Sequence, residues 1–268
     1  MKYNHAMLFV HFSLFIFFTS CNSYNLKSTT KPQERFEIAK KMFDNKDYYE
    51  AKNQFKIITL NNSGASFVDD AQFYLAECHF KMKEYVFAAD EYSRLSRLYP
   101  KSEWLDDAVY KVAICDFNMS PKPALDQAYT LKAIESLQLF LEEYSNSVLV
   151  EEAEKMLGVC RAKLSEKEFK AGELYRKLGD NYGALVYFRS VVDNYYDTEF
   201  LEPAVYWKAE SLFRLERYAE SRLTFEELLR KFPKTDFLGK AKSRLKEIEN
   251  GAGQTKESND VSEQAIDG

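Results

Sequence analysis

Beyond residue 21, three cysteines and one histidine are the side chains whose thiol or imidazole groups could support metal or redox chemistry. Cys78, Cys115 and Cys160 occur at the same register of three related segments, and His79 adjoins Cys78. A thiolate cluster could bind zinc, and two thiols could form a disulfide. Packed helices lie about 8–10 Å apart, whereas a disulfide needs Cα atoms within about 7 Å of each other. We therefore expect buried, unreactive thiols that fill space in a core.

Histidine is too scarce to supply a metal site. The other two histidines, His5 and His11, lie within residues 1–20, so His79 is the one candidate in the rest of the chain. A single histidine cannot build a multi-histidine centre, and adjacent residues on a helix point away from each other. The sequence therefore predicts no metal site.

Paired carboxylates recur along the chain at Asp69-Asp70, Asp106-Asp107 and Glu151-Glu152. Such pairs can perform acid–base catalysis, but each of these falls in the first turn of an expected helix, where the helix dipole stabilises negative charge. Their recurrence favours this structural role. Gly-rich phosphate loops, nucleophile elbows and zinc patterns are also absent from the sequence. We expect no catalytic residues and no cofactor.

The first residues form a candidate lipoprotein signal. Lys2 precedes an apolar stretch over residues 6–18, a layout typical of a secretory signal peptide and short for a membrane span. The run Phe18-Thr19-Ser20-Cys21 resembles a bacterial lipobox, in which the cysteine is diacylated and becomes the new N-terminus. Ser20 is the small residue expected before the cut, and Phe18 is larger than the usual Leu. We predict a lipid on Cys21 and a flexible tether over residues 21–31.

Net charge argues against a nucleic-acid partner. The formal net charge is −5, and removing residues 1–20, which carry only Lys2, leaves −6. No strongly basic tract is present. A nucleic-acid-binding domain would need one.

Internal repeats set the architecture. The segment Phe67–Met82 aligns without gaps on Trp104–Met119, so that Asp69, Ala71 and Cys78, among others, recur 37 residues later. The pattern returns from Phe200 onward and, more weakly, over residues 148–160. Self-similarity at this period is the signature of a repeat array.

Each copy is followed by a second apolar pattern with helical spacing. Tyr85, Ala88, Tyr92 and Leu95 follow one copy, and Pro100 then ends the helix. A helix, a tight turn, a second helix and a Tyr/Phe-Pro ending resemble the tetratricopeptide repeat, which has about 34 residues per unit. The expected fold is all-α, a right-handed superhelical array of about five tetratricopeptide-like hairpins.

The domain organisation follows from these repeats. We expect a signal peptide over 1–20, repeat units over 32–65, 66–101, 102–146, 165–198 and 199–234, a capping helix over 235–250 and a disordered tail over 251–268. Residues 147–178 should form one long helix that enters the fourth unit. Small residues such as Gly172 should let paired helices approach closely.

The third unit carries an insertion that points to a family. Between its helices lies Met119-Ser-Pro-Lys-Pro-Ala-Leu-Asp-Gln-Ala-Tyr-Thr130, followed by Lys132-Ala-Ile-Glu-Ser-Leu-Gln-Leu-Phe140. The leader, the lipobox, five units and this insertion together resemble the BamD family, lipoproteins of the outer-membrane β-barrel assembly machine. The Tyr- and Phe-rich style is similar to the Bacteroidota form. Two unit ends depart from the usual Tyr-Pro, at Tyr144-Ser145 and Tyr195-Tyr196.

The resemblance implies a non-catalytic scaffold on the periplasmic face of the outer membrane. Asn22 after the lipobox is not the Asp that holds many lipoproteins at the inner membrane. Members of the family dock on the periplasmic domains of the barrel-forming, BamA-like assembly protein. They also bind C-terminal segments of unfolded outer-membrane proteins. We expect the C-terminal units to carry the docking surface for the barrel-forming partner, and a groove to take the client.

Two sets of residues are candidates for these contacts. The client groove would use an aromatic row on the first helices of three units, or the same row could seal the repeat cores: Phe36, Phe43, Phe73, Phe80, Tyr110 and Phe117. The insertion, through Pro121, Pro123, Asp126 and Gln127, could be a partner-contact loop or a folded-back plug, with Asp126 as an N-cap.

Other functions remain open from the sequence. A different periplasmic tetratricopeptide lipoprotein, one that coordinates peptidoglycan or pilus assembly, would share the leader and the repeats, but the insertion favours the barrel-assembly role. A hydrolase built on helical repeats would need a clustered polar pocket, and the sequence offers none.

Overall fold

A computed structural model of the protein describes residues 30–252, and all its regular structure there is helical. The helices are α1 (Pro32–Asp44), α2 (Tyr48–Asn61), α3 (Val68–Lys81), α4 (Tyr85–Leu98), α5 (Leu105–Met119), α6 (Ala128–Glu143), α7 (Val150–Lys177), α8 (Asn181–Asn194), α9 (Leu201–Arg214), α10 (Tyr218–Lys231) and α11 (Leu238–Glu247), followed by a π-helical turn, Ile248–Ala252. The predicted leader, Cys21 and residues 253–268 lie outside the described part.

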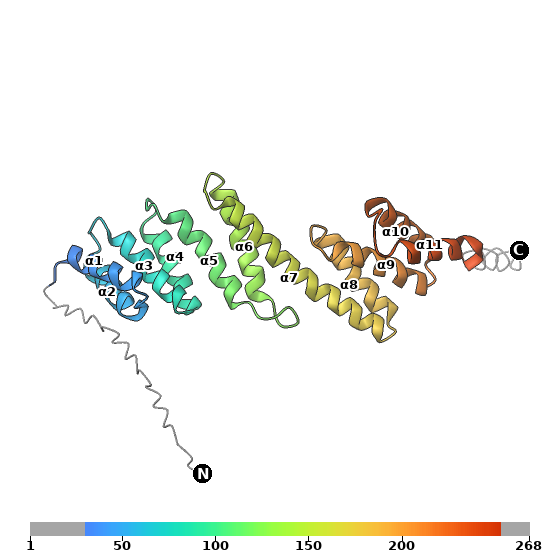
Figure 1. The fold of residues 1–268 in the computed structure, drawn as a ribbon, viewed down its shortest axis with the longest axis horizontal. Helices are drawn as coiled ribbons and strands as arrows, with labels where there is room; N and C mark the ends of the chain where they lie inside the picture. Colours follow the sequence, from blue (N-terminus) through green and yellow to red (C-terminus); the bar gives the residue numbers. More distant parts are fainter. Residues whose placement is uncertain (1–29, 253–268) are drawn as a thin grey trace, which may run out of the picture.

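Consecutive helices pair into hairpins that stack side by side from α1 to α11 (Figure 1). The pairs are α1–α2, α3–α4, α5–α6, the second half of α7 with α8, and α9–α10, and α11 packs at the end. The predicted all-α array of tetratricopeptide-like hairpins is confirmed. The unit boundaries proposed from the sequence stay predictions, since α7 begins upstream of residue 165 and contributes to two neighbouring units.

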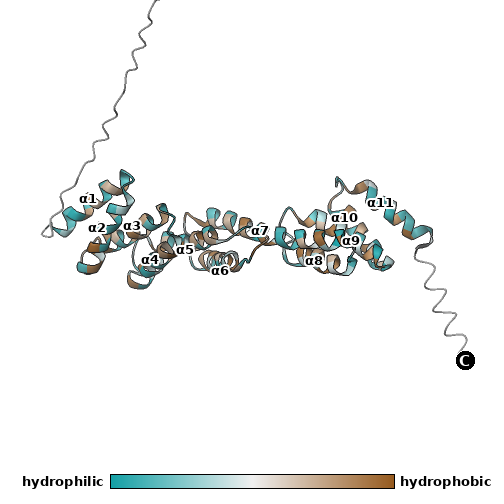
Figure 2. Ribbon diagram, turned by 90° about the horizontal axis from the view of Figure 1, so that it is seen from below, coloured by the Kyte–Doolittle hydropathy of each residue, from teal (hydrophilic) through white to brown (hydrophobic). Residues whose placement is uncertain are grey.

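The ends of the array are its most polar elements. Figure 2 shows α1 and α11 as largely hydrophilic ribbons, with hydrophobic residues gathered along the helices between them. Terminal elements of a repeat array pack on one side only and therefore need a polar outer face.

Four hairpin turns share one backbone conformation, a residue with positive φ shortly after the first helix. Lys46, Lys83, Gly179 and Glu216 follow the first helix of each pair with φ of 67°, 62°, 80° and 60°. A residue in this left-handed conformation lets its amide bond back to the helix, as Lys83 N does to Phe80 O at 2.9 Å. Glycine adopts it without a steric penalty, so Gly179 is the most favourable of the four.

The hairpin of α7 and α8 depends on a close approach at Gly172. A Cβ at this position would lie 2.8 Å from the ring of Phe188, which is fully buried. The expected long helix over 147–178 is present as α7, and its small residue allows the predicted close packing. Gly158, in the first half of α7, has open space around it.

Candidate functional site

The predicted burial of the three thiols is confirmed. Cys78, Cys115 and Cys160 are fully buried and free, each in a hydrophobic core. Burial raises the pKa of Cys78 and Cys115 to about 12 and that of Cys160 to about 11. Since the thiolate is the reactive form, these cysteines are protonated and unreactive at neutral pH. In residues 30–252, no group of three or more potential ligands could hold a metal ion.

First-turn carboxylates join successive hairpins. The indole Nε1 of Trp104 donates to Asp70 at 2.6 Å, the hydroxyl of Ser147 donates to Asp106 at 2.6 Å, and Thr235 donates to Glu202. Each donor lies in or next to the turn that enters the following helix. These carboxylates therefore tie one hairpin to the next, in addition to their favourable place at a helix N-terminus.

Half of the aromatic row lies in the repeat cores. Phe36, Phe73 and Tyr110 are each less than a tenth exposed. Phe73 stacks on Trp104 with ring centroids 4.3 Å apart, and Tyr110 packs against Phe140 at 5.8 Å. Phe36, Phe73 and Tyr110 therefore fill the repeat cores, as the structural alternative for this row predicted.

The other half of the row is only partly covered. Phe43, Phe80 and Phe117 are half-buried near the ends of α1, α3 and α5. Lys111 Nζ lies 4.7 Å from the ring centroid of Phe80, and Lys163 Nζ lies 5.3 Å from that of Phe117. These three keep part of a ring at the surface, so a client contact through them stays a prediction.

The insertion folds around the side chain of Gln127. This residue is 4% exposed, and its Nε2 donates to the carbonyl oxygens of Lys122 at 2.9 Å and Leu125 at 3.2 Å. Its Oε1 accepts from Thr130 at 2.7 Å. Asp126 accepts from the amide of Ala128 at 2.9 Å, so it caps the first turn of α6 from one residue before the N-cap position.

Two lysines of α7 hold the insertion in place. Lys163 donates to the carbonyl of Ser120 at 3.2 Å, and Lys167 donates to that of Leu125 at 3.0 Å. A groove of about 510 Å³ remains between the loop and α7, lined by Lys122, Pro123, Ala124, Glu166, Lys167, Lys170, Ala171 and Leu174. The inner side of the loop is therefore structural, while Leu125 at its tip is 58% exposed. Pro121 and Pro123 are half-buried beside it.

A buried carboxylate marks the seam between α3 and α5. Glu77 is 7% exposed, its Oε1 lies 2.9 Å from Lys111 Nζ, and it accepts from the Tyr92 hydroxyl. Burial and the nearby carboxylate raise the pKa of Tyr92, which keeps the phenol as a donor. Lys81, one turn further along α3, lies 3.9 Å from the other carboxylate oxygen, so the charge of Glu77 is met by two lysines and one neutral donor.

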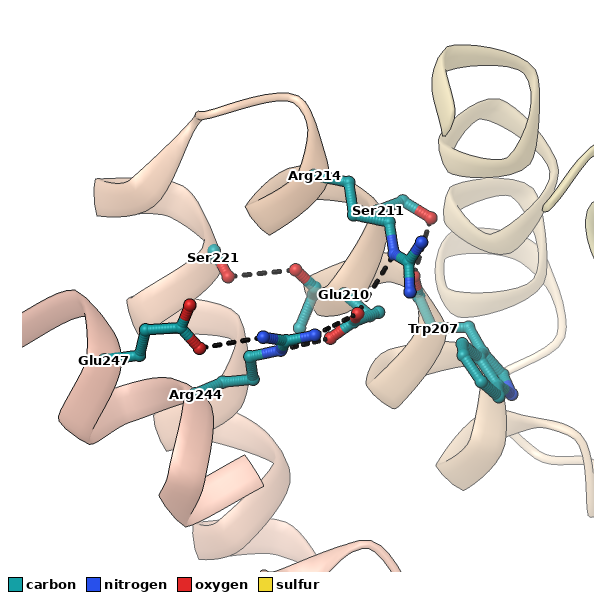
Figure 3. Close-up of polar contacts among 8 residues, drawn as sticks. Trp207, Glu210, Ser211, Arg214, Ser221, Arg244 and Glu247 are labelled. Carbon is teal, nitrogen blue, oxygen red and sulfur yellow. Dashed lines mark hydrogen bonds and ion pairs between the residues drawn. The ribbon is translucent and has the colours of Figure 1, made fainter. Parts of the chain in front are cut away.

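The same seam position recurs between α9 and α11 with different partners (Figure 3). Glu210 is 3% exposed and accepts from Arg244 Nε and Nη2, both at 2.9 Å, and from Arg214 Nε at 3.0 Å. Arg244 also donates to Glu247 at 2.8 Å. These bonds to Glu210 and Glu247 raise the pKa of Arg244.

The seam residues were missed from the sequence, although a signal was available. Glu77 and Glu210 each follow a fully buried alanine, Ala76 and Ala209, and both lie ten residues after the helix N-cap. Lys111 and Arg244 both lie seven residues after theirs. Matching register across hairpins would have paired them.

These hairpins, seams and turns define a tetratricopeptide-type scaffold. A family model described as "Outer membrane lipoprotein" matches residues 28–220, and the chain belongs to this family, YfiO, which is the BamD-type family that the sequence indicated. No helix within residues 30–252 is long and apolar enough to span a bilayer.

Solved structures with similar folds include tetratricopeptide proteins. One from Parabacteroides merdae ATCC 43184 has 15% identity and a TM-score of 0.36, with 87% of this chain and 78% of that chain covered. The TPR2AB domain of yeast Sti1, solved in a complex with pHSP90, has 16% identity and a TM-score of 0.43, with 88% and 95% covered. No curated protein matches the chain.

Proposed function

We propose that this protein is a non-catalytic, lipid-anchored scaffold of the outer-membrane β-barrel assembly machinery, of the Bacteroidota-like BamD form. Membership of the outer membrane lipoprotein family, over a match that includes the insertion, is the observation that carries the proposal. A lipid on Cys21 holds the array at the periplasmic face. The array binds the periplasmic domains of a BamA-like protein and the C-terminal segments of unfolded barrel proteins.

A division of labour within the array supports this role. The rings of Phe43, Phe80 and Phe117 are half-buried and lie near the ends of three successive first helices, where an extended client could contact them in turn. The insertion presents an exposed tip on a rigid base, because Gln127 and the α7 lysines fix its backbone. A fixed loop loses little conformational entropy when a partner binds.

Affinity purification of the lipidated protein from its own membrane tests the assembly role. We expect the barrel-forming protein to co-purify, and Cys21→Ser to release the scaffold from the membrane. Recovery of peptidoglycan or pilus assembly proteins without a barrel-forming protein would reject the proposal in favour of that alternative.

Photo-crosslinking tests the client site separately. A photoreactive residue at positions 43, 80 or 117 should capture unfolded barrel proteins. The same probe at Tyr49 or Phe87, which are 62% and 61% exposed on α2 and α4, provides the control. Equal capture at all five positions, or capture at none, would contradict a client site on the first helices.

A further inference from the structure

Three arginines converge on the face formed by α7, α9 and α11. Arg176 lies in α7, Arg214 in α9 and Arg244 in α11. Arg176 stacks on Trp207 of α9, and Arg214 and Arg244 bind Glu210, three residues further along the same helix. They come from three successive first helices, so the cluster crosses two seams of the array. Nothing in the assembly role proposed above requires it.

The arginines outnumber the carboxylates that they meet. Glu210 accepts from Arg214 and Arg244, and Glu247 accepts from Arg244. With three cations and two anions, the cluster carries one positive charge in excess.

Arg176 is the arginine without a hydrogen-bonding partner. Its guanidinium carbon lies 4.1 Å from the ring centroid of Trp207, and within residues 30–252 it makes no hydrogen bond or ion pair. Its Nε is buried with no acceptor. A guanidinium with an unsatisfied donor gains from any acceptor that reaches it, so an acceptor brought by a ligand would be favourable.

Aromatic rings support two of these guanidinium groups from one side. Trp207 lies under Arg176, and the Phe213 ring centroid lies 4.4 Å from the guanidinium carbon of Arg244. Stacking leaves the in-plane N–H groups of Arg176 for a planar acceptor, and the carboxylate is the acceptor that matches this fork. Arg244 already donates through all three of its nitrogens to Glu210 and Glu247, so it contributes mainly its charge. Arg214, with a side chain 51% exposed, adds donors at the edge.

We propose that Arg176, Arg214 and Arg244 form a binding site for a carboxylate on an extended acidic segment of a protein partner. The excess of one positive charge matches one carboxylate, whereas a dianionic phosphate would meet repulsion from Glu210 and Glu247. Trp207 and Phe213 offer apolar surface to the peptide beside that carboxylate. A strongly acidic polymer such as nucleic acid is disfavoured by the net charge of −5.

Peptide binding to the full chain tests this site. The probe is a fluorescein-labelled peptide with Asp and Glu at alternate positions, and its partner probe carries Asn and Gln there. Fluorescence anisotropy should show salt-dependent binding of the acidic peptide only. Arg176→Gln should weaken it by roughly tenfold, as expected for loss of a bidentate charged hydrogen bond.

The variants distinguish a two-pronged guanidinium–carboxylate contact from non-specific attraction between opposite charges. Arg176→Lys keeps the charge and should still bind several-fold more weakly, because a lysine cannot present two parallel donors. Arg222→Gln is the matched control: Arg222 lies on α10 and pairs with exposed Glu226, so its removal should leave the affinity unchanged. Circular dichroism of each variant checks that the helices remain.

Several outcomes would overturn the site. Equal effects of Arg176→Gln and Arg222→Gln, or equal binding of the amide peptide, would show that no carboxylate is recognised. Competition by inorganic phosphate as effective as that by the acidic peptide would replace the peptide with a phosphate ligand. If binding appears only after deletion of residues 253–268, the occupant is the acidic tail of the chain itself and not a partner.

Discussion

Glu77 and Glu210 occupy the same position on two seams, one in each half of the array, yet different cations meet them. In the N-terminal half, Lys111 and the Tyr92 hydroxyl satisfy Glu77. In the C-terminal half, Arg244 binds Glu210 through two nitrogens and Arg214 adds a third contact. One repeat position therefore supports two different electrostatic solutions.

The difference between the two cations follows from how many helices pack on the helix that carries each of them. Lys111 belongs to α5, which packs against α6 as well as α4, so the hairpin is held by hydrophobic contacts on both sides. Arg244 belongs to α11, which has no second helix over it in the described part of the chain. A single helix of 10 residues needs a stronger attachment, and a two-nitrogen arginine contact supplies it.

The largest expected effect comes from removing Arg244. Arg244→Met leaves Glu210 buried with Arg214 alone, and breaking a buried pair in this way should cost about 3 kcal/mol. Lys111→Met leaves Glu77 with the Tyr92 hydroxyl and Lys81 and should cost about 1 kcal/mol. Urea denaturation followed by circular dichroism measures both.

Hydrogen exchange and thiol labelling show whether each variant loses stability only around its own glutamate. Hydrogen exchange should speed up in α11 for Arg244→Met, while labelling of Cys78, whose pKa of about 12 keeps it protonated at pH 8, should remain slow. Equal losses for the two variants, or rapid labelling of Cys78 in Arg244→Met, would break the contrast between the halves.

The next effect contrasts the two ends of α7. Gly172→Ala forces a methyl group against the buried ring of Phe188 and should destabilise the protein by about 1–3 kcal/mol. Gly158→Ala meets open space and should stabilise α7 by up to about 1 kcal/mol, the helix preference of Ala over Gly. Thermal unfolding should move the two melting temperatures in opposite directions. Similar shifts would contradict the close approach of α7 to α8 at Gly172.

The smallest effect concerns the hairpin turns. Gly179→Ala places a Cβ at φ of 80° and should cost about 1 kcal/mol. Lys83→Gly relieves the same strain at φ of 62°, but it also frees the unfolded chain, so the net change should be below about 0.5 kcal/mol. Urea midpoints compare the two variants. A larger effect at Lys83 than at Gly179 would show that its side chain, and not its backbone, sets that turn.

Helices and their pairing could be read from the sequence because both depend on local spacing. Tyr85, Ala88, Tyr92 and Leu95 share one face at helical period, and α4 begins at Tyr85 and ends before Pro100. The buried thiols followed from the same register. These features need only the sequence of one repeat and its copy.

Contacts between hairpins were harder to predict. The aromatic row shares one register, but the first helix touches helices on both sides, so Phe73 is covered by Trp104 while Phe80 stays partly exposed. The conformation of the insertion is held by Gln127 and by lysines of the later helix α7. Such contacts join residues far apart in the chain, and periodicity within one helix does not reveal them.

Helix α7 makes the array intolerant of changes in length at its centre. Loops between hairpins can absorb an added residue, but each residue inserted into a continuous helix turns everything beyond it by about 100° and moves it about 1.5 Å along the axis. An insertion between Gly158 and Gly172 would thus swing the arginine face away from the aromatic row. The single 28-residue helix α7 fixes the rotation of one half of the array relative to the other. A partner that binds both halves therefore meets binding surfaces whose separation and relative rotation are set by the number of residues in α7.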